Sequence, residues 1–120
     1  MKRKTLFFLF SCSTVFAFAA NTFVTTHGDD AQDGTSWESS VSSIQAAIDA
    51  SASGDTVFIA GGTYNQSVKL KDGVHLLGGY DPSTGKRDYE TFPTVLDGTN
   101  LGKALISQGS AFKTPTYFDG

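Results

Sequence analysis

Residues 93–98 read Pro-Thr-Val-Leu-Asp-Gly, and residues 115–120 read Pro-Thr-Tyr-Phe-Asp-Gly, about 22 residues later. In each copy a proline precedes residues that suit a strand, and an Asp-Gly pair that suits a turn follows. Similar phrases recur at intervals of about 17 to 22 residues, near Val57, Val74 or Leu77, Leu96 and Phe118. Repeats of this length are typical of solenoids, in which each coil buries its apolar side chains against the next. The sequence therefore predicts an all-β solenoid with parallel strands, in which the two prolines occupy the same corner of successive coils.

Short apolar runs, most of them ending on glycine, make up the chain after Gly54. Together with an N-terminal run they predict strands at residues 22–26, 56–60, 67–70, 74–77, 94–96, 104–106 and 116–118. An antiparallel β-sandwich with one helix is the alternative, with Asp72-Gly73 as its hairpin turn. The repeated phrase and the leading helix favour the solenoid.

One helix is predicted, over residues 42–53. Ser42 suits its N-cap, Gln45 completes a capping box, and Gly54 suits its end. Its apolar side chains share one face: Val41, Ile44, Ala47, Ile48 and Ala52. Because an open solenoid end exposes unpaired strand edges, we expect this helix to act as a structural cap. The predicted organisation is a strand, an acidic loop and the cap helix in residues 20–55, then the first coils in residues 56–120.

Residues 1–19 have the pattern of a secretory signal peptide. A basic start, Met1 to Lys4, precedes an uncharged apolar run, and Ala17 and Ala19 are small residues suited to signal peptidase. We expect cleavage near Ala19 or Ala20, export to a bacterial surface or the medium, and no membrane span afterwards. A lipoprotein signal with acylated Cys12 is the rival, and the apolar run that continues past Cys12 argues against it.

Removal of this segment leaves the chain strongly acidic. Three of its nine cationic residues leave and all twelve acidic residues stay, so the net charge becomes −6. Such a surface repels nucleic acid and anionic membrane. The only cysteine leaves as well, which excludes disulfides, thiol catalysis and thiolate metal sites.

The segment from Thr22 to Gly120 resembles the N-terminal part of secreted right-handed parallel β-helix proteins of the pectin-lyase-like superfamily. The resemblance rests on several stretches: the loop at residues 28–37, the helix at 44–50 running into 54–57, the first coil at 58–64, and the phrases at 72–74 and 77–80. It implies the first coils of a right-handed parallel β-helix with an N-terminal helical cap. It also implies a truncated chain, whose C-terminal edge is covered by further coils or a partner.

An acidic loop offers candidate metal ligands. Asp29, Asp30 and Asp33 lie within five residues, and carboxylate oxygens are the ligands that calcium prefers. Calcium is the one cofactor that these residues suggest, although their spacing does not match a helix-loop-helix site. The alternative is a solvated turn in which Asp and Gly shape the backbone.

Two aromatic residues, Trp37 and Tyr80, are candidates for stacking on sugar rings, although Trp37 could instead pack beside the helix. Among enzymes of the family it resembles, lyases use a cationic base, which singles out Lys86 and Arg87. His27 and His75 stand far apart and give no triad or zinc pattern. The sequence thus contains no catalytic constellation.

Function is expected to be structural in this segment, with the whole protein binding or processing extracellular polysaccharide, as the resemblance implies. One alternative is a calcium-dependent polysaccharide lyase whose catalytic coils lie beyond Gly120. Another is a surface adhesin without chemistry.

Overall fold

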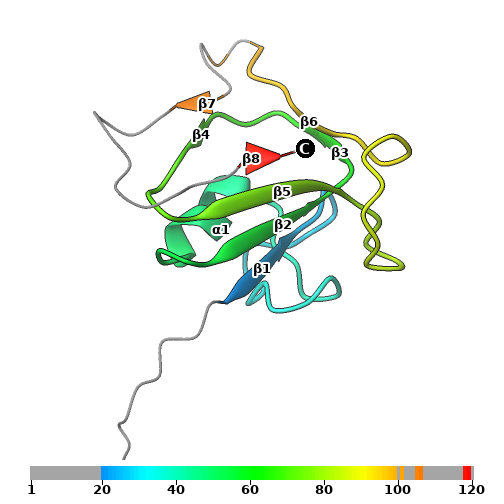
Figure 1. Cartoon of the computed structure of the whole chain (residues 1–120), viewed down its shortest axis with the longest axis horizontal. Helices are drawn as coiled ribbons and strands as arrows, with labels where there is room; N and C mark the ends of the chain where they lie inside the picture. The colour runs from blue at the N-terminus through cyan, green and yellow to red at the C-terminus, as the bar shows by residue number, and fades with distance from the viewer. Residues whose placement is uncertain (1–19, 100, 102–104, 107–117, 120) are drawn as a thin grey trace, which may run out of the picture.

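The computed structural model describes residues 20–99, 101, 105–106 and 118–119 (Figure 1). Its elements in chain order are β1 (Asn21–Val24), α1 (Ile44–Ala50), β2 (Thr56–Ala60), β3 (Gly62–Tyr64), β4 (Val68–Lys69), β5 (His75–Tyr80), β6 (Thr94–Leu96), β7 (Leu105–Ile106) and β8 (Phe118–Asp119). The predicted signal peptide, including Cys12, and Pro115 lie outside the described residues. Within the described part, no helix combines the length and the apolar composition that a membrane crossing requires.

The largest sheet has the order β1-β2-β5-β8, and each of its neighbouring strands pairs in parallel. Side chains alternate between its two faces because successive residues of a strand point in opposite directions. On the inner face Val24, Ile59 and Leu76 are buried almost completely. On the outer face Phe23 and Phe58, which pair in register, are only partly buried. One face therefore forms the core and the other carries exposed aromatic rings.

Two smaller sheets, β3-β6 and β4-β7, close the remaining sides of this core, and both pair in parallel. Tyr64 from β3 and Val68 from β4 are buried in the same hydrophobic cluster as the inner face of the large sheet. The Tyr64 hydroxyl donates a hydrogen bond of 2.9 Å to the Ala60 carbonyl oxygen, so its buried polar atom is satisfied. Because every ladder among the described strands is parallel, the antiparallel sandwich alternative is wrong.

The predicted solenoid, and with it the right-handed parallel β-helix, is also wrong. The described residues form a small compact domain with one helix, and the repeat that predicted successive coils does not occupy equivalent places. In the first copy of the phrase Thr94–Leu96 forms β6, which pairs with β3, and Asp97 follows the strand. In the second copy Phe118–Asp119 forms β8, which pairs with β5 in a different sheet.

Contacts specific to the first copy explain this difference. The Pro93 carbonyl oxygen accepts from the Gly62 backbone N–H at 2.9 Å. The Thr94 hydroxyl accepts from the Gly79 N–H at 2.8 Å and lies 3.1 Å from the Ala60 carbonyl oxygen. These bonds hold the copy at the corner after β2, whereas local sequence similarity carries no information about which sheet a strand joins.

Helix α1 closes the core, but it is shorter than the predicted helix over residues 42–53, and its N-cap lies one residue later. Ser43, not Ser42, is the N-cap, and its hydroxyl accepts from the Ala46 N–H at 3.1 Å. Gln45 forms no capping box, because its side chain accepts from the Lys69 N–H and donates to Asp49. Four of the five side chains predicted to share the apolar face are buried, with 7% or less of their surface exposed: Val41, Ile44, Ala47 and Ile48. The fifth, Ala52, lies beyond the end of the helix and is exposed.

The acidic loop covers the outer edge of β1. The Phe23 N–H donates to the Gly34 carbonyl oxygen at 2.9 Å, and the Thr25 N–H donates to the Val41 carbonyl oxygen at 3.0 Å. The Val41 N–H in turn donates to the Phe23 carbonyl oxygen at 3.0 Å. Since these backbone groups would otherwise be an exposed template for pairing, the loop completes the sheet at that edge.

Replacement of Ile48 by Ala should lower the free energy of unfolding by about 2–5 kcal/mol, because it opens a cavity under the helix. Denaturant unfolding followed by circular dichroism would measure the change. Val95→Ala is the matched control, since Val95 is 46% exposed and its truncation should cost no more than about 0.5 kcal/mol. Equal effects of the two variants would contradict the capping role of α1.

Removal of the Asp30 carboxylate by Asp30→Ala should destabilise the fold by about 0.5–2 kcal/mol, the usual range for a lost helix cap. Asp30 Oδ1 accepts from the backbone N–H groups of Ser42 and Ser43, both at 2.9 Å, just before α1. Asp30→Asn retains an acceptor oxygen and should cost less. Thermal melting of the three proteins would decide, and an Asn variant as unstable as the Ala variant would contradict this role.

Candidate functional site

A cluster of aromatic rings covers the outer face of the large sheet. The rings of Phe23 on β1 and Phe58 on β2 stack with centroids 5.4 Å apart and an interplanar angle of 20°. Trp37, from the loop beside β1, meets Phe23 edge-on with centroids 4.7 Å apart. The rings are partly exposed, so they form an apolar surface and not a second core.

Tyr80 at the end of β5 joins this cluster through an irregularity in the sheet. The register between β2 and β5 shifts after Phe58, so that Ala60 pairs with Tyr80. Gly79 makes the shift possible with a φ of 83°, a conformation that side chains disfavour. The Tyr80 ring then lies edge-on to Phe58, with centroids 5.2 Å apart, and 5.7 Å from the Trp37 ring. The two residues predicted from sequence as sugar-stacking candidates are therefore neighbours.

Arg87 extends the aromatic surface with a positive charge. Its guanidinium carbon lies 6.0 Å from the Tyr80 ring centroid and 5.9 Å from the Tyr89 ring centroid, which is the range of cation–π attraction. Its Nε donates to the Gly78 carbonyl oxygen at 2.8 Å, which fixes the side chain against β5. Tyr89 is 58% exposed and so presents its ring to solvent.

The loop between β5 and β6 is held in place by its own carboxylates. Asp81 accepts from the Ser83 N–H at 3.0 Å and from the Ser83 hydroxyl at 2.7 Å. Asp88 accepts from the Thr91 N–H at 3.1 Å and from the Thr91 hydroxyl at 2.8 Å. These hydrogen bonds hold the pKa of both carboxyls below its usual range, and the bonds from the hydroxyl groups have the largest effect. The loop is thus preorganised.

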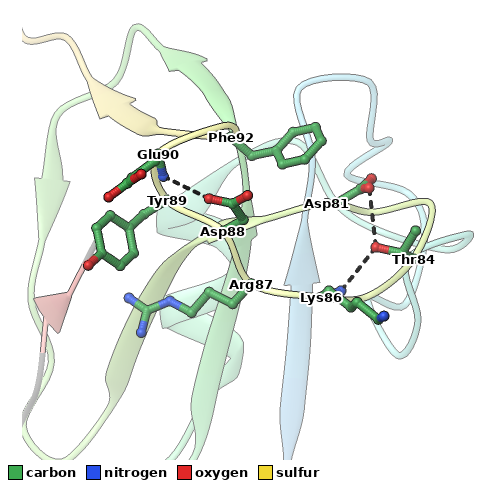
Figure 2. Close-up of a pocket in the computed structure, with 8 residues that line it drawn as sticks. All are labelled: Asp81, Thr84, Lys86, Arg87, Asp88, Tyr89, Glu90 and Phe92. Carbon is green, nitrogen blue, oxygen red and sulfur yellow. Dashed lines mark hydrogen bonds between the residues drawn. The ribbon is translucent and has the colours of Figure 1, made fainter.

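A hollow of about 560 Å³ opens beside this loop, and Figure 2 shows its side chains projecting from the two arms of the loop. Its lining consists of Asp81, Thr84, Lys86, Arg87, Asp88, Tyr89, Glu90 and Phe92. Apolar rings and charges of both signs therefore stand together around one open cavity. Most of the lining residues are polar or charged and two are aromatic, so the hollow offers hydrogen-bonding groups beside ring surfaces.

The loop and the aromatic cluster form one continuous surface. A Cβ atom at Gly85, near the loop tip, would lie 3.6 Å from Nε1 of Trp37. Tyr80 and Arg87 also form an antiparallel backbone bridge. We name this region the outer aromatic surface and define it by Phe23, Trp37, Phe58, Tyr80, Arg87 and Tyr89.

The three predicted calcium ligands have other roles. Asp29 accepts from the Ala31 N–H at 2.9 Å, Asp30 caps α1, and Asp33 accepts from the N–H and hydroxyl of Thr35. The hydrogen bond from the Thr35 backbone N–H is the main cause that lowers the pKa of Asp33. No group of three His, Cys, Asp or Glu side chains within the described residues is placed to hold a metal ion. These carboxylates shape the loop backbone, and calcium binding by the three residues stays a prediction.

The other residues singled out in the sequence are placed as follows. Lys86 and Arg87 both line the hollow, while the Nδ1 atom of His27 lies 3.2 Å from the neighbouring Thr26 hydroxyl. Sequence reasoning missed Phe23, Phe58 and Tyr89. For the first two a signal existed, because each is an aromatic residue flanked by inward-facing residues of a strand.

No family model, curated protein or solved structure matches this chain.

The loop should lose its preorganisation in acid. Because the pKa of Asp88 is lowered in the folded state, its contribution to loop stability is present above the unfolded value of about 3.9 and disappears as the pH falls through the folded value. A carboxyl-carbon NMR titration should therefore place the Asp88 midpoint below 3.9. Thr91→Val removes the hydroxyl donor and should move that midpoint upward; an unmoved midpoint would contradict the assignment.

Proposed function

We propose that this protein binds extracellular polysaccharide through the outer aromatic surface. The observation that carries the proposal is the row of partly exposed rings, from Trp37 through Tyr80 to Tyr89, with Arg87 between the last two. Indole and phenol rings present a flat apolar body with a polar edge. Sugar rings have the matching combination of apolar C–H faces and equatorial hydroxyl groups.

The charged groups beside the rings suit hydroxyl recognition. Lys86 and Arg87 supply donors, and Asp81 and Glu90 supply acceptors, around the same hollow. Several of these groups are already oriented by the loop, which reduces the entropy lost on binding. Because the predicted exported chain carries a net charge of −6, a neutral polysaccharide is favoured over an acidic one.

An extracellular location supports a polymer of this class as the ligand. The predicted signal peptide would direct the chain to the outside of the cell, and structural polysaccharides occur there. Polymeric ligands also suit an open surface, because several weak stacking contacts along one polysaccharide chain together raise the overall affinity.

Tyr89→Ala should weaken polysaccharide binding about tenfold, which corresponds to about 1.4 kcal/mol. Isothermal titration calorimetry against a panel of neutral and anionic polysaccharides would give the dissociation constants. Tyr89 is the best first target, because it is 58% exposed and its truncation should leave the core intact.

Two controls sharpen this test. Tyr89→Phe keeps the ring and should retain most of the affinity, whereas Val95→Ala changes an exposed residue on β6 outside the surface and should not alter it. If no polysaccharide in the panel binds, or if Tyr89→Ala and Val95→Ala bind alike, the proposal fails.

A further inference from the structure

A buried carboxylate, that of Asp55, lies beside the backbone of Ala20, just before β1. Asp55, between α1 and β2, has 8% of its surface exposed. Its Oδ1 accepts from the Ala20 backbone N–H at 2.8 Å, and its Oδ2 accepts from the Ala52 backbone N–H at 2.8 Å. Both oxygens are therefore engaged, and one of them is directed at the first described residue.

Ala20 is held in front of this carboxylate by backbone pairing. The Thr56 N–H donates to the Ala20 carbonyl oxygen at 3.0 Å, and Asn21 then begins the parallel register with Thr56. The Asp55 carbonyl oxygen accepts from the His75 N–H at 3.0 Å, which ties the other side of Asp55 to β5. The Ala20 nitrogen and the Asp55 carboxylate are thus positioned by the sheet itself.

The two hydrogen bonds to this carboxylate come from neutral backbone N–H groups, and Lys71 compensates its charge only weakly. Lys71 acts on Asp55 only as the last and weakest of the causes that lower its pKa, behind the N–H groups of Ala20 and Ala52. The Lys71 ammonium group is instead 2.6 Å from the Ser51 carbonyl oxygen and 3.3 Å from that of Asp49. His75 meets Asp55 through its backbone, as described above. A buried carboxylate is costly unless a positive charge or several donors compensate it.

The sequence predicts signal-peptide cleavage near Ala19 or Ala20, and the Ala19–Ala20 bond is the one that would complete this arrangement. We propose that Asp55 is the receptor for the α-ammonium group of a chain that begins at Ala20. Hydrolysis by a signal peptidase adds the hydroxyl of water to the Ala19 carbonyl carbon and a proton to the Ala20 nitrogen. The freed amine takes a further proton from solvent near neutral pH, so the neutral donor that faces the Asp55 carboxylate becomes a positively charged one.

This arrangement links processing to folding. The precursor has only a neutral N–H at this position, whereas the processed chain gains a charged pair at the start of β1. Only a chain that begins at Ala20 places its amino group beside Asp55, because an amino group at Asn21 would lie one residue further along the strand. The processed form is therefore the more stable one, and the chain is anchored one residue before β1.

The first test uses the full chain, exported from a secreting host with its own leader. Intact mass should place the N-terminus at Ala20. After reductive ¹³C-methylation, NMR titration should give the α-amine a pKa above its ordinary value of about 7.7–8.0. Asp55→Asn should return it to that range, while the matched control Asp49→Asn should not, because Asp49 is an exposed carboxylate bonded to Gln45.

A second test uses the wild-type protein and is needed if the Asp55→Asn variant does not fold. Selective acetylation of the wild-type α-amine removes its charge and keeps its N–H. Since the pKa of the paired amine is raised and that of Asp55 is lowered, the charged pair stabilises the fold from above about pH 4 to about pH 8, and the amine's share disappears as the pH rises through its folded pKa. Acetylation should therefore lower the Tm at pH 6 and have little effect at pH 10. An N-terminus at another residue, an α-amine that titrates alike in wild type and Asp55→Asn, or equal melting of acetylated and free protein would overturn the proposal.

Discussion

The parallel pairing of β2 with β1 on one side and β5 on the other is the interaction on which the rest of the structure depends. Through it Val57 and Ile59, both almost fully buried, meet Val24 and Leu76 at the centre of the core. The chain reaches β2 directly from Asp55 and leaves it at the corner that receives Thr94. Loss of this central strand would remove the partner that joins β1 to β5 in the large sheet.

Strand alternation divides the labour between the two faces of that sheet. Inner residues bury aliphatic side chains under α1, whereas the aromatic rings outside are only partly buried. The outer rings are consequently available for contacts with another molecule, and the β5 irregularity at Gly79 brings Tyr80 among them. The proposed binding surface is therefore a by-product of one register shift and one preorganised loop.

Local features of the fold were predictable from sequence, and long-range ones were not. Short apolar runs that end on glycine indicated β2 and β5, and the one-sided apolar stripe indicated α1. β3 was missed because the Gly61-Gly62 pair resembles a turn. The helix start moved to Ser43 because Asp30, far upstream, takes the N–H groups of Ser42 and Ser43. Trp37 and Tyr80 were both identified as candidates, but their contact depends on the tertiary fold, as does the assignment of the two Asp-Gly phrases to different sheets.

The loop that covers β1 makes the two edges of the large sheet different, because it occupies the backbone groups at the β1 edge. With Phe23 and Thr25 already bonded to the loop backbone, a strand from another molecule finds no free ladder at that edge. Any growth of the sheet by strand addition, whether in assembly or in aggregation, is confined to the side away from β1. The β1 edge of the sheet is thus closed to strand exchange with other molecules.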